Sequence, residues 1–180
     1  MDQPSKIYVF LLRKALALLS KRRYTVLKLK RKLILALEKK LQSDPVTADN
    51  LSDRAVSEVF EQEIHQVLSR LKDLKYLDDT AYTKDFIESR TSSSRPRGKF
   101  ILKRELKNKG IHPELAERIV EESEINEEEL AFESLLKKAK AIERAEPRKQ
   151  KEKALRFLAS RGFKIDAIYK AVDRWYNERS

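Results

Sequence analysis

The sequence predicts an all-α fold built from repeated helical units. Two stretches share one pattern, Lys109-Gly110-Ile111 and Arg161-Gly162-Phe163, and each ends a basic segment with helical periodicity. The 180-residue chain contains only three glycines, and two of them occupy the same place in the two copies. A glycine just past the last helical residue adopts the left-handed conformation at little cost. We therefore expect Gly110 and Gly162 to end helices in a unit that is used at least twice.

The composition agrees with a helical protein. Charged residues make up 38% of the chain, against about 25% in an average soluble domain. Three glycines and five prolines leave little turn chemistry for an all-β fold. Cysteine is absent, which excludes disulfide and thiolate chemistry. The apolar run over 7–19 is interrupted by Arg13 and Lys14, is too short to span a bilayer and lacks a signal-peptide cleavage site. We expect a cytoplasmic monomer that is not associated with a membrane.

The first predicted unit covers residues 1–76. Apolar residues at helical spacing predict a helix over 7–20, and Thr25 is a suitable N-cap for a second helix over 26–41. This unit is degenerate, because Leu37 stands where the other two copies have glycine.

A long polar loop over 42–50 then separates the second helix from the third. Either Asn50 or Ser52 can cap this third helix. Its apolar stripe consists of Val56, Phe60, Ile64, Val67, Leu71 and Leu74.

The second predicted unit covers residues 77–123. It follows the break at Tyr76, and Asp78 with Asp79 supplies a helix cap and a first-turn acid. This explains the paired carboxylates better than general acid–base catalysis does. We expect the aromatic residues of this region to lie in the core: Tyr76, Tyr82 and Phe86.

The rest of the second unit follows a linker over 91–96. A fifth helix is predicted over 99–109, and Pro113 suits the first turn of a sixth.

The third predicted unit covers residues 124–180, which makes nine helices in three triplets. Asn126 is a cap like Asp78, and the break at Glu146-Pro147 precedes an eighth helix over 151–161. The ninth helix is predicted from an apolar face formed by Ile165, Ile168, Tyr169, Val172 and Trp175.

Charge alternates along the chain. Residues 13–40 contain eleven basic residues and one acid, 114–133 contain nine acids and one basic residue, and 137–164 contain eleven basic residues and three acids. Basic zones of this kind indicate a polyelectrolyte partner, although solvated helix faces are the plainer alternative. The predicted nucleic-acid-binding residues are Arg22, Arg23, Lys28, Lys32, Arg97, Lys103, Arg104, Lys109, Arg148, Lys149 and Arg161.

No catalytic, metal or cofactor site is predicted. The chain has no glycine-rich phosphate loop and no nucleophile in a recognisable setting. His65 and His112 lie on different elements, without the ligand spacing of a metal site.

The residues resemble the RecX family of regulatory proteins over nearly the whole chain. In the first unit the resemblance rests on these residues: Ala15-Leu16, Leu18-Leu19, Arg22, Thr25 at the cap, Leu29 and Lys32-Leu33. The strongest match is in the middle unit: Val67-Leu68, Leu71, Tyr76-Leu77-Asp78-Asp79, Tyr82, Phe86-Ile87, Arg90, Gly98, Ile101, Glu105-Leu106 and Lys109-Gly110-Ile111. The third unit adds Phe157-Leu158, Arg161-Gly162-Phe163 and Ile168. The chain departs from the family at Lys28, where glutamate is frequent, and in lacking a glycine after the second helix.

This resemblance implies three tandem three-helix units in an elongated, curved arrangement. It also implies a modulator of the RecA recombinase, active in DNA repair, homologous recombination and the SOS response. Such proteins bind the groove of the RecA–DNA filament and restrain strand exchange and coprotease activity. Some also bind single- or double-stranded DNA without sequence preference.

A stand-alone DNA-binding protein of helix-turn-helix type is the alternative. Amides that read bases are scarce in the basic helices, where only Asn108 and Gln150 occur. That composition favours phosphate contacts over sequence readout.

Overall fold

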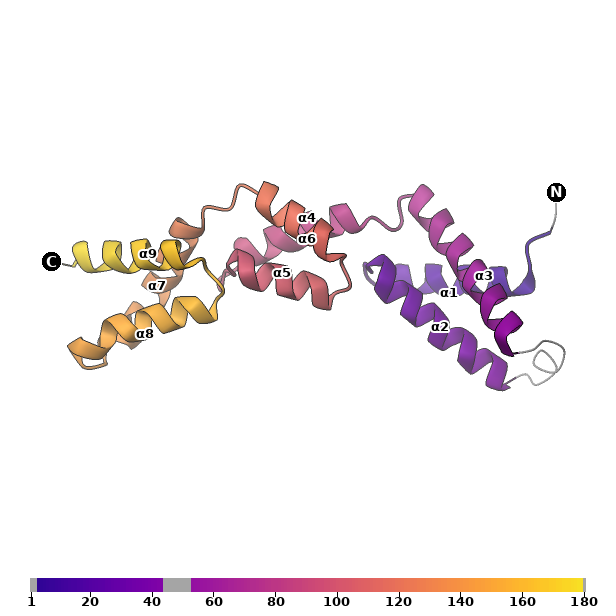
Figure 1. The fold of residues 1–180 in the computed structure, drawn as a ribbon, viewed down its shortest axis with the longest axis horizontal. Helices are drawn as coiled ribbons and strands as arrows, with labels where there is room; N and C mark the ends of the chain where they lie inside the picture. The colour runs from indigo at the N-terminus through magenta and orange to yellow at the C-terminus, as the bar shows by residue number, and fades with distance from the viewer. Residues whose placement is uncertain (1–2, 44–52, 180) are drawn as a thin grey trace. The chain divides into compact units, whose positions relative to one another are not determined.

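The computed structural model describes residues 3–43 and 53–179, and in these ranges the chain is helical with connecting segments and no strand (Figure 1). This confirms the all-α prediction. The described helices are α1 (Lys6–Leu19), α2 (Val26–Ser43), α3 (Asp53–Asp73), α4 (Asp79–Thr91), α5 (Lys99–Asn108), α6 (Pro113–Glu122), α7 (Glu127–Glu143), α8 (Pro147–Ser160) and α9 (Ile165–Asn177).

The chain forms two compact units. The first contains residues 1–82 and 109–111, and the second contains 83–108 and 112–180. The sequence-based division into three units at 76/77 and 123/124 stays a prediction.

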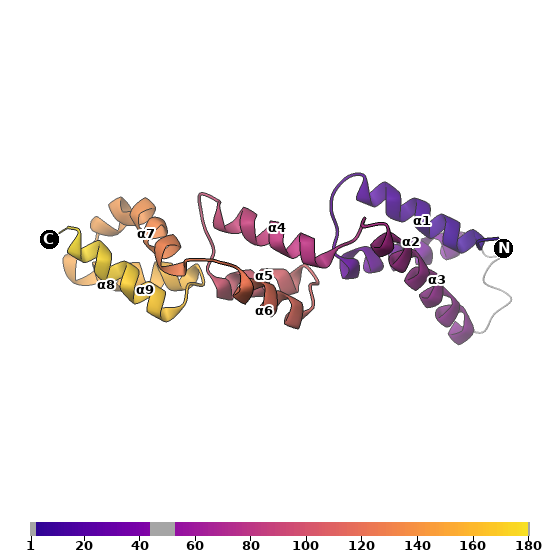
Figure 2. The ribbon, with the colours of Figure 1, turned by 90° about the horizontal axis from the view of Figure 1, so that it is seen from above.

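The core of the first unit lies among α1, α2 and α3, which Figures 1 and 2 show as one group. Its buried side chains are Leu11, Ala15, Leu29, Leu33, Leu37, Ile64, Val67, Leu68, Leu71 and Leu77. The predicted α3 stripe holds at Ile64, Val67 and Leu71, but Leu74 follows the end of the helix and is 48% exposed. The side chain of Val56 lies outside the described residues.

The helix ends of this unit agree with the sequence signals in part. Thr25 is fully buried, and its hydroxyl accepts the Lys28 N–H at 3.3 Å, as expected of an N-cap. Helix α2 continues to Ser43, so the predicted loop at 42–50 begins too early, because the Gln42-Ser43 pair extends the helix. The rest of that loop and both candidate caps, Asn50 and Ser52, lie outside the described residues.

The core of the second unit lies mainly among α7, α8 and α9, while α5 packs on α6. Its buried cluster is Ala131, Phe132, Leu135, Ile142, Ala154, Leu158, Phe163, Ile168, Ala171, Val172 and Trp175. Two residues predicted on the apolar face of α9 are exposed, Ile165 by 66% and Tyr169 by 48%. The buried face instead uses the alanines Ala167 and Ala171, whose small side chains let the helix approach its neighbours.

Helix α8 begins earlier than predicted. Pro147 occupies its first position, where the missing N–H costs nothing, so the polar turn before Lys151 is already helical. The cap at Asn126 is confirmed, because its side chain accepts the Glu129 N–H at 3.1 Å.

Both predicted glycine positions are confirmed. Gly110 has φ of 86° and Gly162 has φ of 79°, each in the left-handed region. Lys75, just after α3, adopts φ of 60° without being glycine. Its backbone is held by a hydrogen bond from the Tyr76 N–H to the Leu71 carbonyl at 2.9 Å, which closes the end of the helix.

The loops that contain Gly110 and Gly162 are each hydrogen-bonded to the start of another helix in the same compact unit. These helices are α2 for the Gly110 loop and α5 for the Gly162 loop. In the first unit, the Thr25 hydroxyl donates to the Lys109 carbonyl at 2.6 Å, beside Gly110. In the second, Gly98 donates its N–H to the Arg161 carbonyl at 3.0 Å, and Phe100 donates to the Gly162 carbonyl at 3.2 Å.

We call each of these contacts between a glycine loop and a helix start a joint. At each joint a carboxylate also accepts a hydrogen bond from the first N–H of the helix. Asp79 accepts the N–H of Val26, the first residue of α2, at 3.0 Å. Glu127, which is 7% exposed, accepts the N–H of Lys99, the first residue of α5, at 2.9 Å. Each carboxylate is itself the first residue of a helix, α4 or α7. The repeat visible in the sequence therefore extends to a repeated way of capping helices.

Burial makes the pKa of Asp79 higher than that of an ordinary aspartate, although the Val26 N–H and nearby Lys72 lower it. Asp78 is confirmed as a cap, since it accepts the Ala81 N–H at 2.9 Å. The prediction of an aromatic core here is wrong for Tyr76, which is 58% exposed beside the turn after α3.

The other two aromatics of that region, Tyr82 and Phe86, are half-buried. Each lies against an arginine: the Arg23 guanidinium is 5.9 Å from the Tyr82 ring centroid, and that of Arg90 is 5.1 Å from the Phe86 ring. Their rings therefore serve partly as cation–π surfaces rather than as fully buried core.

Candidate nucleic-acid and filament interface

The predicted cations near the start of α2 are exposed. The guanidinium of Arg22 lies 4.8 Å from the Tyr24 ring centroid, and Arg23 lies over Tyr82. Lys28 and Lys32 are exposed one turn apart on α2 and form no ion pair with any described residue. These two charges are available for an external anion.

The cations of α5 divide into paired and unpaired residues. The Lys103 ammonium contacts Glu117 and lies 2.8 Å from the Glu121 carboxylate on α6. Arg97, just before the helix, lies 3.9 Å from Glu105. Arg104 is exposed and forms no ion pair within the described residues. Of the α5 candidates, it therefore has the charge most available to DNA.

Glu121 is the centre of a structural ion-pair network. It contacts Lys103 at 2.8 Å, Lys99 at 3.2 Å and Lys164 at 3.6 Å. Hydrogen bonds from Lys103 and Lys99 lower the pKa of Glu121 to about 2. Because the lysines of this network pair with glutamates of α6, much of their charge is balanced within the fold. They are therefore less available to an external anion.

The remaining predicted residues lie at helix ends. Arg148 and Lys149 are exposed in the first turn of α8, where Lys149 lies 2.9 Å from Glu146. Lys109 is half-buried beside the Gly110 loop. Gln150 donates to the Glu143 and Ala145 carbonyls at 3.2 and 3.0 Å, which commits one of the two candidate base-reading amides to the fold.

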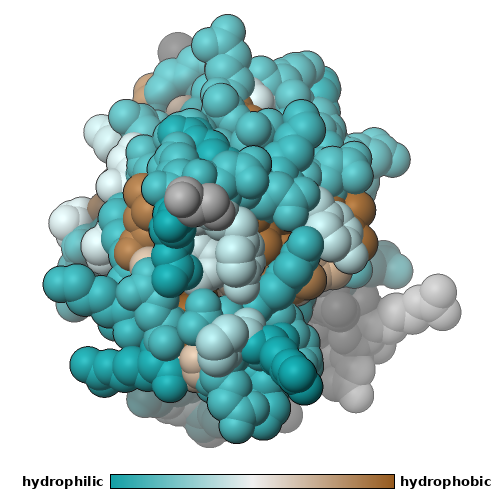
Figure 3. Space-filling view, turned by 90° about the vertical axis from the view of Figure 1, so that its left-hand side faces the viewer, coloured by the Kyte–Doolittle hydropathy of each residue, from teal (hydrophilic) through white to brown (hydrophobic). Residues whose placement is uncertain are grey.

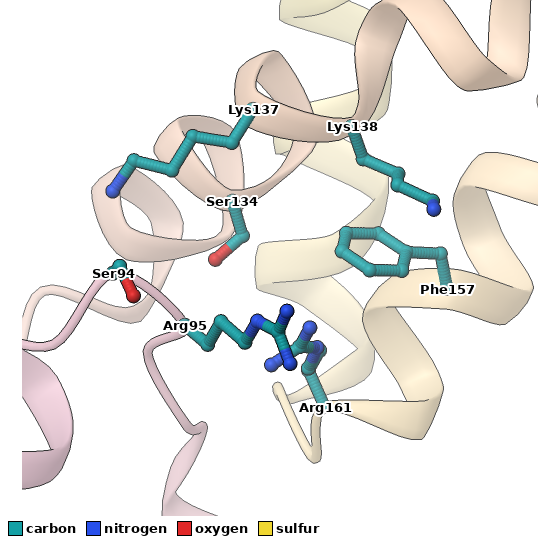
Figure 4. Close-up of a pocket in the computed structure, with 7 residues that line it drawn as sticks. All are labelled: Ser94, Arg95, Ser134, Lys137, Lys138, Phe157 and Arg161. Atoms are coloured by element: carbon teal, nitrogen blue, oxygen red, sulfur yellow. The ribbon is translucent and has the colours of Figure 1, made fainter.

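Arg161 belongs to a basic hollow in the second unit. The hollow has a volume of about 440 Å³, and we call it the basic hollow below. Its lining residues come from the segment before α5, from α7, and from the end of α8 with its cap (Figure 4). They are Ser94, Arg95, Ser134, Lys137, Lys138, Phe157 and Arg161.

The charge of this hollow is unbalanced. No acidic side chain lines it, and none of its four cations forms an ion pair with a described residue. The Arg161 guanidinium lies 5.3 Å from the Phe157 ring centroid. Burial, together with the charges of Arg97 and Arg95, lowers the pKa of Arg161. An anion placed here would relieve repulsion between like charges.

Most of the hollow was not predicted as a site. Arg95, Lys137 and Lys138 belong to basic or linker segments of the sequence, but nothing local shows that they converge with Arg161. The only sequence feature that points to the hollow is the excess of basic residues over 137–164. This excess identifies a basic segment but does not show which of its residues form a site. Figure 3 shows a mostly hydrophilic face with small separate apolar patches.

No group of three or more His, Cys, Asp or Glu side chains able to hold a metal occurs among the described residues. Within the same residues, no helix combines the length and apolar character needed to cross a membrane.

Known proteins are similar to this chain in sequence and in fold. Residues 126–172 match the family model described as the third three-helix domain of RecX. The regulatory protein RecX of Thermus thermophilus is 33% identical over 115 residues, which are 64% of this chain and 70% of that protein. The chain belongs to the RecX family.

Two further RecX proteins show how much of the chain is similar in sequence and in structure. RecX of Leuconostoc mesenteroides is 30% identical over 129 residues, which cover 71% of this chain but only 47% of that relative. The chain thus matches about half the length of this RecX and more of the Thermus protein. The crystal structure of RecX from Lactobacillus salivarius superposes with a TM-score of 0.70 at 20% identity, covering 93% of this chain and 96% of that one. This structural likeness supports the RecX fold.

Proposed function

We propose that this RecX-family protein is a negative regulator of the RecA recombinase. It binds the groove of the RecA–DNA filament in the cytoplasm and restrains strand exchange and coprotease activity during DNA repair and recombination. The observation that carries the proposal is family membership, because relatives of about 30% identity are regulatory RecX proteins.

The surface supports a partner that contains phosphate. Lys28, Lys32 and Arg104 are exposed without described ion pairs, and the basic hollow adds further unbalanced cations. Lysine and arginine bind phosphates without reading sequence, which suits a filament assembled on any DNA. The exposed acids around α6 that pair with no described lysine or arginine supply charge of the opposite sign for contacts with protein: Glu114, Glu122 and Glu124.

The proposal is tested by measuring ATP hydrolysis by RecA on single-stranded DNA while the purified protein is titrated in. We expect hydrolysis to fall as the protein is added. A Lys28→Ala/Lys32→Ala variant should require a higher concentration for the same effect. The matched control, Lys140→Ala/Lys153→Ala, removes two exposed lysines from α7 and α8 and should act like the unmodified chain.

The alternative, a stand-alone DNA-binding protein, predicts a different result. The chain would then bind duplex DNA with strong preference for one sequence and leave RecA activity unchanged. That outcome would replace the proposed function. The commitment of Gln150 to backbone carbonyls argues against such sequence reading.

A further inference from the structure

The basic hollow contains a buried hydroxyl without a partner. Ser134 is 5% exposed, and its Oγ has no hydrogen-bond partner in the structure. Figure 4 shows this hydroxyl pointing from α7 into the hollow, toward Arg95. Buried hydroxyls are normally satisfied, and an orphaned one costs free energy. Such a group is explained if a ligand supplies the missing acceptor.

The cations around the hydroxyl define the ligand as an anion. Arg95 and Arg161 bring planar guanidinium groups, and Lys137 and Lys138 bring ammonium groups from α7. No carboxylate lines the space to balance them. Guanidinium groups match the oxygens of phosphate in geometry, and lysine adds point charge. A nucleic-acid strand brings a phosphate with every nucleotide, so neighbouring phosphates together meet all four cations, whereas one carboxylate side chain offers a single charge.

Phe157 narrows the choice to nucleic acid. Its ring is half-buried at the hollow and already lies against the Arg161 guanidinium. Aromatic rings beside basic grooves stack with the bases of single strands, irrespective of sequence. A strand presents a base next to a phosphate, and the hollow presents a ring next to cations.

We propose that the basic hollow is a phosphate-binding site for single-stranded nucleic acid, in which Ser134 Oγ donates a hydrogen bond to a backbone phosphate oxygen. Arg95, Lys137, Lys138 and Arg161 contact this phosphate and its neighbours along the strand, and Phe157 contacts the neighbouring base. This inference deepens the proposed function and rests on its DNA-binding part. RecA is not needed to test it.

The decisive variant is Ser134→Ala, because it changes no charge. In the free protein it removes an unsatisfied buried hydroxyl, so the melting midpoint should stay equal or rise. Affinity for a fluorescein-labelled oligodeoxythymidylate should nevertheless fall about ten- to a hundredfold, the loss of one hydrogen bond to a charged group. An equal or higher midpoint together with weaker binding supports the site. Unchanged affinity overturns it.

A second pair of variants separates the hollow from the general basic field. Lys137→Ala/Lys138→Ala should weaken binding and reduce the slope of log affinity against log salt by about 1.4, from two phosphate contacts on a single strand. The control Lys140→Ala/Lys153→Ala removes the same charge outside the hollow, one lysine from α7 and one from α8. If both double variants lose affinity and slope equally, there is no localised site.

Competition identifies the source of the anion. Unlabelled oligodeoxythymidylate should displace the probe, while ATP or inorganic phosphate at the same phosphate concentration should not. Displacement by ATP would assign the hollow to free nucleotides instead. Displacement by polyglutamate of equal charge would assign it to an acidic protein segment, and either result overturns the proposal. If the unmodified chain inhibits RecA but Ser134→Ala binds DNA normally, the proposal that the hollow binds phosphate is wrong. The proposed function as a RecA regulator is then unaffected.

Discussion

Replacing Gly98 with alanine tests the joint between α5 and the Gly162 loop. Gly98 has no positive φ, so its conformation alone does not require glycine. A Cβ at this position would lie 2.2 Å from the Gly162 carbonyl oxygen and 2.4 Å from the Phe163 nitrogen. Ordinary contact begins at 3.4 Å, and both neighbours are backbone atoms that cannot rotate away. The two segments must separate by roughly 1 Å.

That separation breaks the hydrogen bonds of the joint. The Gly98-to-Arg161 and Phe100-to-Gly162 bonds are 3.0 and 3.2 Å long, so an added ångström removes both. Each loss costs about 1 kcal/mol. Alanine also stabilises the folded state by about 0.4–1 kcal/mol, because it lowers the conformational entropy of the unfolded chain. The net destabilisation is about 1–2 kcal/mol, which lowers the melting midpoint by about 3–6 °C in a chain of this size.

Circular dichroism at 222 nm during heating measures the shift, and amide hydrogen exchange reports the joint itself. The Phe100 N–H should exchange faster in Gly98→Ala than in the unmodified chain. Asn108→Ala, an exposed change at the end of the same helix, should move the midpoint by less than a third as much. A normal midpoint and a protected Phe100 amide in Gly98→Ala would refute the reasoning about the joint.

Three further predictions follow from the described contacts. Gly110→Val should cost about 1 kcal/mol or more in unfolding free energy, because a β-branched residue resists φ of 86°; an unchanged urea midpoint would contradict this. Glu121→Gln should cost about 1 kcal/mol at pH 7, a value reduced for exposure of the carboxylate. Because the folded pKa is lowered from 4.5 to about 2, this stability is fully present above pH 4.5 and is lost as pH falls toward 2. The difference from the unmodified chain should therefore shrink as pH falls below 4.5 and vanish only below pH 2, and a constant difference across this range would refute the assignment. Arg104→Ala should lower DNA affinity and its salt slope more than Lys103→Ala does, because Lys103 is held by acids of α6; equal effects in salt titrations would show that internal pairing is irrelevant.

Helix ends were predictable where the signal is local. Glycine after a basic residue indicated the left-handed turns at Gly110 and Gly162, and short polar side chains indicated the caps at Thr25 and Asn126. The same local logic misplaced the start of α8, because the polar turn after Pro147 has no apolar pattern to extend.

Features that depend on tertiary approach could not be predicted. Gly98 has no positive φ, so only its closeness to Gly162 shows why glycine is needed. In the sequence, Ser134 is an ordinary serine on an amphipathic helix. Only the fold shows that it lines the same hollow as Arg95 and Arg161, which come from other segments. Residue type alone places Tyr76 in the core, but it follows Lys75, whose left-handed conformation turns the chain at the end of α3 and leaves Tyr76 exposed.

Strand exchange catalysed by RecA tests the central claim most directly. The purified chain is added to preformed RecA filaments on single-stranded DNA, and both its sedimentation with the filaments and the yield of exchanged duplex are measured. We predict that the chain sediments with the filaments at salt concentrations where it no longer binds naked single strands, and that exchange falls as it binds. Binding to naked DNA with full exchange and no preference for the filament would contradict regulation of RecA.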